Sequence, residues 1–330
     1  MNLLRRSRID AGLTQADLAT RAGVSRQLVG AVEAGRHLPR VDAALALASV
    51  LGIGVAELFE SVETPVDIVS GLPPEQAALV RAGRVGERVV TSPARIGPAG
   101  WDVADGVVEE GRLRRFVRDA PGMVVAGCEP GLEAMERILR EGGMGAVSAI
   151  ASSRTALEAL AAGRVHAAVV HGPALGVERD DLDVQRVRLT QWQVGLAAAP
   201  DAPRGWWQEA LSGAIPVVQR EAGAGVQRAF ESAVETNGVV AGPRVGTHYE
   251  AAHRAVLMGM AGVTIEPAAL ALGASFKTLE THEAQLWIDR RWTAERLVVA
   301  ALDVIAGSRF QRRLQAVGGY DLAGCGELIT

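Results

Sequence analysis

The 330-residue sequence has little cysteine and no long apolar run. Cys128 and Cys325 are too few and too far apart in the chain to suggest a disulfide framework or a thiolate metal site. No window approaches the roughly 18 consecutive apolar residues of a membrane-spanning helix, and the start "MNLLRRSRID" lacks the apolar stretch of a secretory signal. These absences argue against secreted and membrane classes. They predict a cytoplasmic protein with reduced thiols, no metal and no cofactor.

Positive charge is also scarce. The formal net charge is −4, so no overall basic field favours nucleic acid, and any DNA contact must come from a local patch. Lys277 is the only lysine, which codon usage explains better than a recognition role. Hydrophobic residues make up 48% of the chain, enough to bury sizeable cores, and the length fits two or three domains.

Sequence periodicity divides the chain into three stretches. Residues 1–62 carry helical patterns in short packets and predict an all-α bundle. Residues 63–120 contain Pro, Gly and short β-rich pieces such as "RVGERVVTS", which predict a linker and a small β-rich accessory segment. Residues 121–330 alternate short apolar runs with helical patterns, as in a mostly parallel sheet covered by helices. The predicted fold class is therefore multidomain.

The α/β stretch contains two successive series of strands and helices, which predict two lobes. The segments "WQVGLAAAP" and "QLWIDRRW" are the natural crossings between the lobes, and "TAERLVVAALDVIAG" predicts a helix that returns to the first lobe. Trp192 and Trp287 lie at these crossings. They are expected to pack in the core or to line a cleft between the lobes.

Residues 14–35, "TQADLATRAGVSRQLVGAVEAG", contain two short helix patterns joined by a glycine. Thr14 is a suitable N-cap for the first helix, and Gly23 tolerates the left-handed conformation that ends it. Ser25 then caps the second helix after a very short turn. Two helices joined so tightly cross at a steep angle.

The faces of the second helix differ in character. Val29 and Val32 share one face and are expected to pack on the first helix, whereas Arg26 and Gln27 point outward near its start. This is the layout of a helix-turn-helix, in which the first residues of the second helix meet base edges in the major groove.

Along residues 1–60 the chain resembles the phage-repressor (Xre-type) helix-turn-helix family, in "RRSRIDAGLTQADLATRAGVS" and "VEAGRHLPRVDAALALASVLG". The resemblance implies double-stranded operator DNA as a partner. It implies Gln15 on a phosphate and Arg26 and Gln27 on bases. Arg36, beyond the end of the second helix, would contact the DNA backbone. The resemblance also implies a structural ion pair between Arg6 and Glu33. The implied DNA-contacting residues are Gln15, Ser25, Arg26, Gln27 and Arg36.

Base recognition is expected to depend on few side chains. Arginine suits guanine O6 and N7, and glutamine suits adenine N6 and N7, which fits Arg26 and Gln27. Gly30 and Ala31 stand where relatives often have longer polar side chains.

Three junctions in the α/β stretch place polar residues between a strand and a helix: "VVAGCEPGLE", "SAIASSRTALEAL" and "VVQREAGAGVQRAF". In such folds, ligands bind at the carboxyl ends of strands, beside helix N-termini. In the third junction Arg220 precedes a Gly-Ala-Gly turn. Its guanidinium and the free N–H groups of the helix favour an anion or carboxylate. The alternative is a surface ion pair of Arg220 with Glu221 or a neighbouring acid.

Residues 122–316 resemble the type II periplasmic-binding-protein-like domain that is fused to helix-turn-helix regulators and related to molybdate-binding proteins. The resemblance implies an effector cleft between the lobes. A Ser-Arg-Thr run replaces the family's glycine-rich stretch, and Ala224 stands at a position where relatives often have serine. Bare molybdate is therefore not favoured over a small polar or carboxylate-bearing molecule. The implied cleft residues are Cys128, Glu129, Ser152, Ser153, Arg154, Thr155, His171, Arg220, Gly223, Ala224, Gly225, Thr247 and Glu266.

The sequence thus predicts a one-component, non-enzymatic transcriptional regulator that binds operator DNA, senses a small molecule and forms a homodimer. Two alternatives stay open. The first is a DNA-tethered enzyme that uses the cleft, with Cys128 as nucleophile and His171 or His248 as base. The second is a repressor whose large domain only dimerises.

Overall fold

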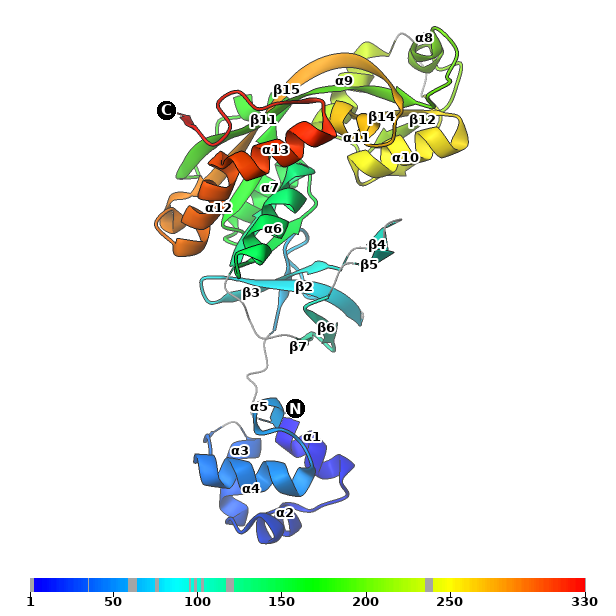
Figure 1. Cartoon of the computed structure of the whole chain (residues 1–330). Coiled ribbons are helices and arrows are strands. Elements are labelled where there is room, and N and C mark those ends of the chain that lie inside the picture. The colour runs from blue at the N-terminus through cyan, green and yellow to red at the C-terminus, as the bar shows by residue number, and fades with distance from the viewer. Residues whose placement is uncertain are drawn as a thin grey trace. The chain divides into compact units, whose positions relative to one another are not determined.

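The computed structural model describes residues 3–34, 36–58, 64–74, 77–94, 96–97, 100–101, 104–116, 122–234 and 240–329. The chain divides into two compact units, Met1–Thr64 and Pro65–Thr330 (Figure 1). Within the described ranges, no helix is long and apolar enough to cross a membrane.

The first unit is a small helical bundle. Its core is built from buried aliphatic side chains of all the long helices, among them Leu4, Leu18, Val29 and Leu47. The helices are α1 (Leu3–Asp10), α2 (Gln15–Ala22), α3 (Arg26–Glu33), α4 (Val41–Leu51) and α5 (Val55–Leu58).

The turn between α2 and α3 has the caps that the sequence predicts. Thr14 accepts a hydrogen bond from the backbone N–H of Asp17, whose carboxylate accepts from the backbone N–H of Thr14 in return. Gly23 ends α2 with a φ of 66°, in the left-handed region where glycine is favoured. Ser25 then caps α3 by accepting from the N–H of Leu28 at 3.1 Å.

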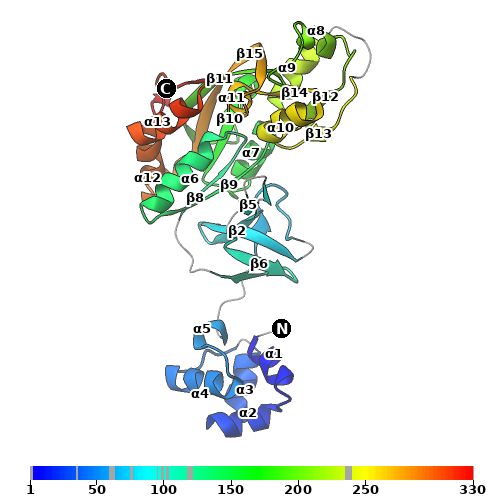
Figure 2. The same cartoon turned by 45° about the vertical axis from the view of Figure 1, so that its right-hand side comes forward.

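The second unit begins with a five-stranded sheet of order β1-β3-β2-β6-β7, antiparallel except for the parallel pair β1–β3. Its strands β2 and β6 are labelled in Figure 2. Ile68, Val85 and Val90 of this part share one hydrophobic cluster with Val124 and Val147 of the α/β part. The strands are β1 (Val66–Asp67), β2 (Ala78–Val85), β3 (Arg88–Pro93), β6 (Gly106–Glu109) and β7 (Arg112–Arg115), with a separate pair β4 (Ile96–Gly97) and β5 (Gly100–Trp101).

A ten-stranded mixed sheet forms the rest of this unit, with the path β13-β12-β14-β11-β15-β10-β8-β9 and with β16 and β17 paired to β11. Its strands are β8 (Gly122–Ala126), β9 (Gly145–Ala149), β10 (Ala167–His171), β11 (Val184–Ala198), β12 (Val217–Arg220), β13 (Arg244–Val245), β14 (Ala261–Ile265), β15 (Ser275–Asp289), β16 (Tyr320–Asp321) and β17 (Leu328–Ile329). The helices that cover it are α6 (Gly131–Glu141), α7 (Ser153–Ala161), α8 (Trp206–Leu211), α9 (Gly225–Ala233), α10 (His248–Met258), α11 (Glu266–Leu270), α12 (Arg296–Ala306) and α13 (Ser308–Val317), with short 3-10 turns η1 (Gly172–Gly176) and η2 (Arg290–Trp292).

Two long antiparallel strands, β11 and β15, run through both halves of the large sheet (Figure 1). β15 pairs with β10 in the first lobe, and β11 pairs with β14 in the second lobe. The predicted crossing segments lie in these strands, and the predicted returning helix is α12, which packs on α6 of the first lobe. Strands β8, β9 and β10 of the first lobe, and β12, β13 and β14 of the second, are parallel and are joined through helices, whereas β16 and β17 pair antiparallel with β11. Both lobes therefore direct the carboxyl ends of their parallel strands toward loops that precede helices.

A buried ion pair joins the five-stranded sheet to the first lobe. Arg81 of β2 donates to Glu136 of α6 at 2.6 Å and also to the backbone carbonyl of Ala146. Glu136 in turn accepts from the N–H of Ser148. Because both charged side chains are almost fully buried, the small sheet is fixed to the first lobe by a desolvated, directional contact.

We expect Arg81→Ala to lower the free energy of unfolding of this unit by about 1–3 kcal/mol, because buried Glu136 and the carbonyl of Ala146 would each lose a hydrogen-bond donor, while Glu136 keeps its pair with Arg140. Arg154→Ala is the control: it breaks an exposed pair with Glu158 and should change stability by less than about 1 kcal/mol. Denaturant unfolding can be followed by tryptophan fluorescence, since all six tryptophans belong to this unit. Equal effects of the two substitutions would contradict the prediction.

Candidate functional site

The start of α3 presents polar side chains to solvent. Ser25, Arg26 and Gln27 are exposed, as is Arg36 beyond the end of the helix. Among the described residues, none forms an ion pair with either arginine, so both guanidinium groups are free to meet phosphates or bases.

Behind this surface, a buried carboxylate connects three helices. Glu33 accepts from Arg8 at 2.6 Å and from Gln15 at 2.8 Å. Burial acts to raise the pKa of Glu33, but these two hydrogen bonds hold it below its ordinary value. Arg8 takes the place predicted for Arg6, since α1 buries positions 4 and 7 and leaves position 6 in solvent. Gln15 is therefore held in place by Glu33, against the C-terminal half of α3.

In the α/β domain, the carboxyl end of β12 places Arg220 in a buried polar cluster between the lobes. Arg220 is only 1% exposed. Its guanidinium donates to the carbonyls of Val245 and Gly246, to Nδ1 of His248 at 2.7 Å and to Sγ of Cys128 at 3.5 Å. Cys128 follows β8 of the first lobe, so Arg220 bridges the two lobes.

All of these acceptors are uncharged. Within the described residues, no carboxylate lies within 4.0 Å of the Arg220 guanidinium. The alternative of a surface ion pair with Glu221 is wrong, because Arg220 is buried and Glu221 is exposed. A buried cation without a counter-ion is costly, and an anion supplied by a ligand would relieve that cost.

His248, at the start of α10, adds an unpartnered donor. Because a guanidinium can only donate, Nδ1 of His248 must be the bare nitrogen and Nε2 must carry the proton. Nε2 is buried and has no hydrogen-bond partner among the described residues. Burial, followed by Arg220, lowers the pKa of His248 well below its ordinary value, although the nearby Cys128 carbonyl acts in the opposite direction.

Trp192 of β11 forms the floor of the cluster. Its ring centroid lies 5.0 Å from that of His171, 5.7 Å from that of His282 and 6.0 Å from that of His248. Its indole Nε1 donates to the buried carboxylate of Glu129 at 2.7 Å. The rigid Trp192 ring thus brings together three imidazoles that come from three separate elements of the fold.

Glu129 acts as an internal anchor. Its carboxylate also accepts from the N–H of Gly131, from Thr190 and from the Tyr320 hydroxyl. Burial raises the pKa of Glu129, while these hydrogen bonds partly offset that effect. Because the Glu129 carboxyl group is fully engaged with donors of its own chain, it orients the Trp192 ring.

A chain of hydrogen bonds leads from the cluster toward solvent. Nδ1 of His171 lies 3.4 Å from Nδ1 of His282, and Nε2 of His282 lies 2.9 Å from the half-exposed carboxylate of Glu280. Burial, then the charges of His282, Arg220 and Arg228, lower the pKa of His171 to about 3. In the described part of the chain, no three His, Cys, Asp or Glu side chains are grouped as a metal site would require.

The structure brings several other predicted cleft residues to this cluster. Ser153 accepts from the backbone N–H of His171 at 3.2 Å. A Cβ on Gly225 would approach the His171 ring to 3.3 Å, so only glycine leaves the ring its present position. Buried Ala224 is the N-cap of α9, and Thr247 caps α10 directly before His248.

The remaining predicted residues have other contacts. Ser152 caps α7 through the N–H of Thr155. Arg154 is 75% exposed and pairs with Glu158. Gly223 is exposed, and its φ of 82° serves the turn before α9. Glu266 begins α11 and approaches Gly319 near the C-terminal strands.

The sequence analysis did not include His282 among the site residues, and it gave His248 only as a candidate catalytic base. His282 is separated by one residue from Glu280 in a strand, a spacing that places both on one face. That alternation was the available signal. Cys128, considered as a nucleophile, has Arg220 as its hydrogen-bond partner, and among the described residues no imidazole contacts its sulfur.

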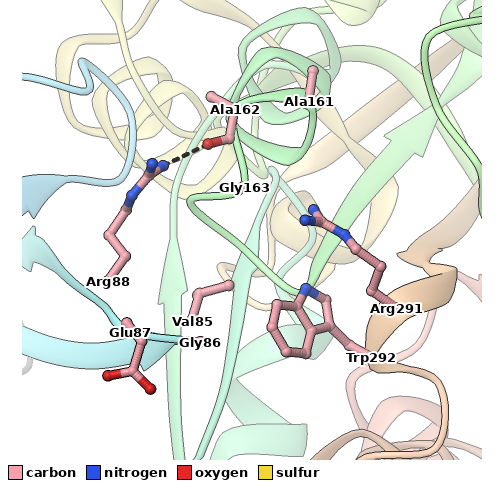
Figure 3. Close-up of a pocket in the computed structure, with 9 residues that line it drawn as sticks. All are labelled: Val85, Gly86, Glu87, Arg88, Ala161, Ala162, Gly163, Arg291 and Trp292. Atoms are coloured by element: carbon pink, nitrogen blue, oxygen red, sulfur yellow. Dashed lines mark hydrogen bonds between the residues drawn. The ribbon is translucent and has the colours of Figure 1, made fainter.

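A separate hollow of about 590 Å³ lies at the tip of the β2–β3 hairpin (Figure 3). Its two arginines are already engaged: Arg88 donates to the carbonyl of Ala162, and Arg291 pairs with Asp289. It contains none of the predicted site residues. We therefore locate the candidate site in the buried cluster around Arg220, because that cluster has an unpaired charge and an unsatisfied donor.

Comparison with known proteins matches both units of the chain. Residues 2–60 match the profile of a helix-turn-helix domain, and residues 136–306 match that of a PBP superfamily domain. An uncharacterised HTH-type transcriptional regulator of Methanocaldococcus jannaschii is 38% identical over 58 residues, 18% of this chain and 88% of the relative. Another, of Methanothermobacter thermautotrophicus, is 46% identical over 50 residues, 15% of this chain and 72% of the relative.

Similar solved structures include a phosphate-bound putative phosphate transporter substrate-binding protein of Clostridium perfringens. It has a TM-score of 0.49 and 12% identity, covering 59% of this chain and 97% of that one. The effector-binding domain of QuiR with shikimate has a TM-score of 0.42 and 10% identity, covering 60% of this chain and 99% of that one.

The buried histidines predict a stability that depends on pH. Since the folded-state pKa of His171 is about 3, below its ordinary value, the stabilisation is complete above about pH 6.5 and is lost as the pH falls toward 3. Each such histidine lowers the free energy of unfolding by about 1.4 kcal/mol per pH unit in that window. Denaturant unfolding between about pH 7 and 5 should show a smaller slope for His171→Gln than for wild type. Arg154→Ala should keep the wild-type slope, and an equal slope in His171→Gln would refute the assignment.

Proposed function

The chain belongs to the helix-turn-helix transcriptional regulators that carry a PBP superfamily domain, and from this premise we propose that it is a cytoplasmic one-component regulator controlled by a small anionic effector. The observation that carries the effector assignment is the buried Arg220 guanidinium, which contacts only uncharged acceptors. A carboxylate or oxyanion would complete this site.

The DNA-contacting residues of the proposal are Gln15, Ser25, Arg26, Gln27 and Arg36. Support comes from the exposure of the α3 start and from the fixed position of Gln15 against Glu33. One such module covers too little DNA for tight specific binding, so we infer a homodimer on a two-fold symmetric operator.

Effector control requires that the cleft respond to an anion. Arg220 joins the second lobe to Cys128 of the first lobe through a weak N–H···S contact. An anion would replace the sulfur as the partner of the guanidinium, because a charged acceptor forms a stronger hydrogen bond than a thiol. The distance between the lobes would then depend on the effector.

Selection of binding sites from random DNA should return an inverted repeat for the full-length protein. Gln27→Ala should relax one base position in each half-site, with a loss of about 1–3 kcal/mol for the preferred base. Arg36→Ala should weaken binding to all DNA sequences alike. It should also reduce the slope of log K against log salt concentration by about one. A single half-site, or equal effects of the two substitutions, would argue against these roles.

Small anions should stabilise the protein through Arg220. In thermal unfolding at constant ionic strength, we expect at least one of acetate, lactate, sulfate and phosphate to raise the Tm of wild type. Arg220→Gln should lose this effect, whereas Arg154→Ala should keep it. The anion-free DNA affinity of Arg220→Gln should equal that of wild type, because the proposed DNA contacts lie in the other unit. Stabilisation that persists in Arg220→Gln would reject the site.

A further inference from the structure

The contact between Arg220 and His248 determines which ring nitrogen of His248 carries a proton. Arg220 has only N–H groups, so it forces His248 to carry its proton on Nε2. That N–H is buried and unpartnered among the described residues. On the second-lobe side, the cluster therefore offers the guanidinium and one imidazole N–H as hydrogen-bond donors.

His171, on the first-lobe side, has the opposite hydrogen-bond polarity, which is set by its contact with His282. The Glu280 carboxylate can only accept, so Nε2 of His282 must donate to it. In a neutral His282 this leaves Nδ1 bare, and it accepts from Nδ1–H of His171 across 3.4 Å. Nε2 of His171 then carries no proton and can only accept a hydrogen bond. Both His171 and His248 pack on the Trp192 ring, so this acceptor belongs to the same cluster as the two donors.

We propose that His171 determines the ligand specificity of the cleft by accepting a hydrogen bond, so that the effector is a small carboxylate bearing a hydroxyl group beside its charge. The carboxylate contacts Arg220 and Nε2–H of His248, and the hydroxyl donates to Nε2 of His171. This inference rests on the proposed function of the cleft as the effector site.

Two-bond ¹H–¹⁵N spectra of the full-length labelled protein test the tautomer without any ligand. At about pH 7.5 we expect His171 to carry its proton on Nδ1 and to leave Nε2 bare. Glu280→Gln should also populate the tautomer of His171 with its proton on Nε2, because a glutamine amide can donate to Nε2 of His282 as well as accept from it. Glu283→Gln, in the same strand and paired with Arg188, should leave the tautomer unchanged. A proton on Nε2 of His171 in the wild-type protein, or equal changes in the two variants, would overturn the assignment.

Lactate and propionate, which differ by one hydroxyl, test the ligand class. At about pH 7.5, calorimetry should show lactate binding at least about tenfold tighter than propionate, since propionate leaves the His171 lone pair unsatisfied. Equal affinities, or no binding of either anion, would overturn the class.

The outcomes separate this inference from the function on which it rests. If phosphate or sulfate stabilises the protein through Arg220 while lactate does not, the hydroxy-acid class fails and the anion-responsive cleft stands. If His171 carries its proton on Nδ1 but no anion acts through Arg220, the tautomer assignment stands and the effector role of the cleft fails.

Discussion

The arrangement of the α/β domain depends on one buried positive charge. Arg220 is fixed by two backbone carbonyls, one imidazole and one thiol, and none of these partners neutralises it. A folded chain tolerates such a charge only where the surrounding structure holds it in place. The backbone of β13 and the start of α10 provide that support, and both belong to the same lobe as Arg220 itself.

A second buried charge stabilises the opposite side of the cluster without pairing with the first. Glu129 accepts from a backbone N–H and from the side chains of Thr190, Trp192 and Tyr320. These donors come from β11, from β16 and from the start of α6, so the carboxylate connects the first lobe to a crossing strand and to the C-terminal strands. Since the network is satisfied on every side, the Trp192 ring is rigid and so are the histidines that pack on it.

The small β sheet shares its core with the first lobe and is joined to it by Arg81 and Glu136. The second lobe connects to the first through β11 and β15, and the pairing of these strands is interrupted by register shifts near Thr190 and Gly195. A change in the spacing of the lobes therefore moves the small sheet together with the first lobe. The small sheet contains β1, the first strand of the second unit in the sequence, so the beginning of this unit belongs to the same side as the first lobe.

Local sequence signals determined the elements of this protein. The caps at Thr14 and Ser25, the glycine at position 23 and the two crossing strands follow from short-range rules, because capping and periodicity act within a few residues. Arg220 was also predicted from its place after a strand. Its lack of a counter-ion, the anchoring role of Glu129, the pairing of Glu33 with Arg8 and the part played by His282 were decided only by the tertiary structure. Those properties depend on burial and on partners tens of residues away, and no local pattern records which side chains water can reach once the lobes have packed.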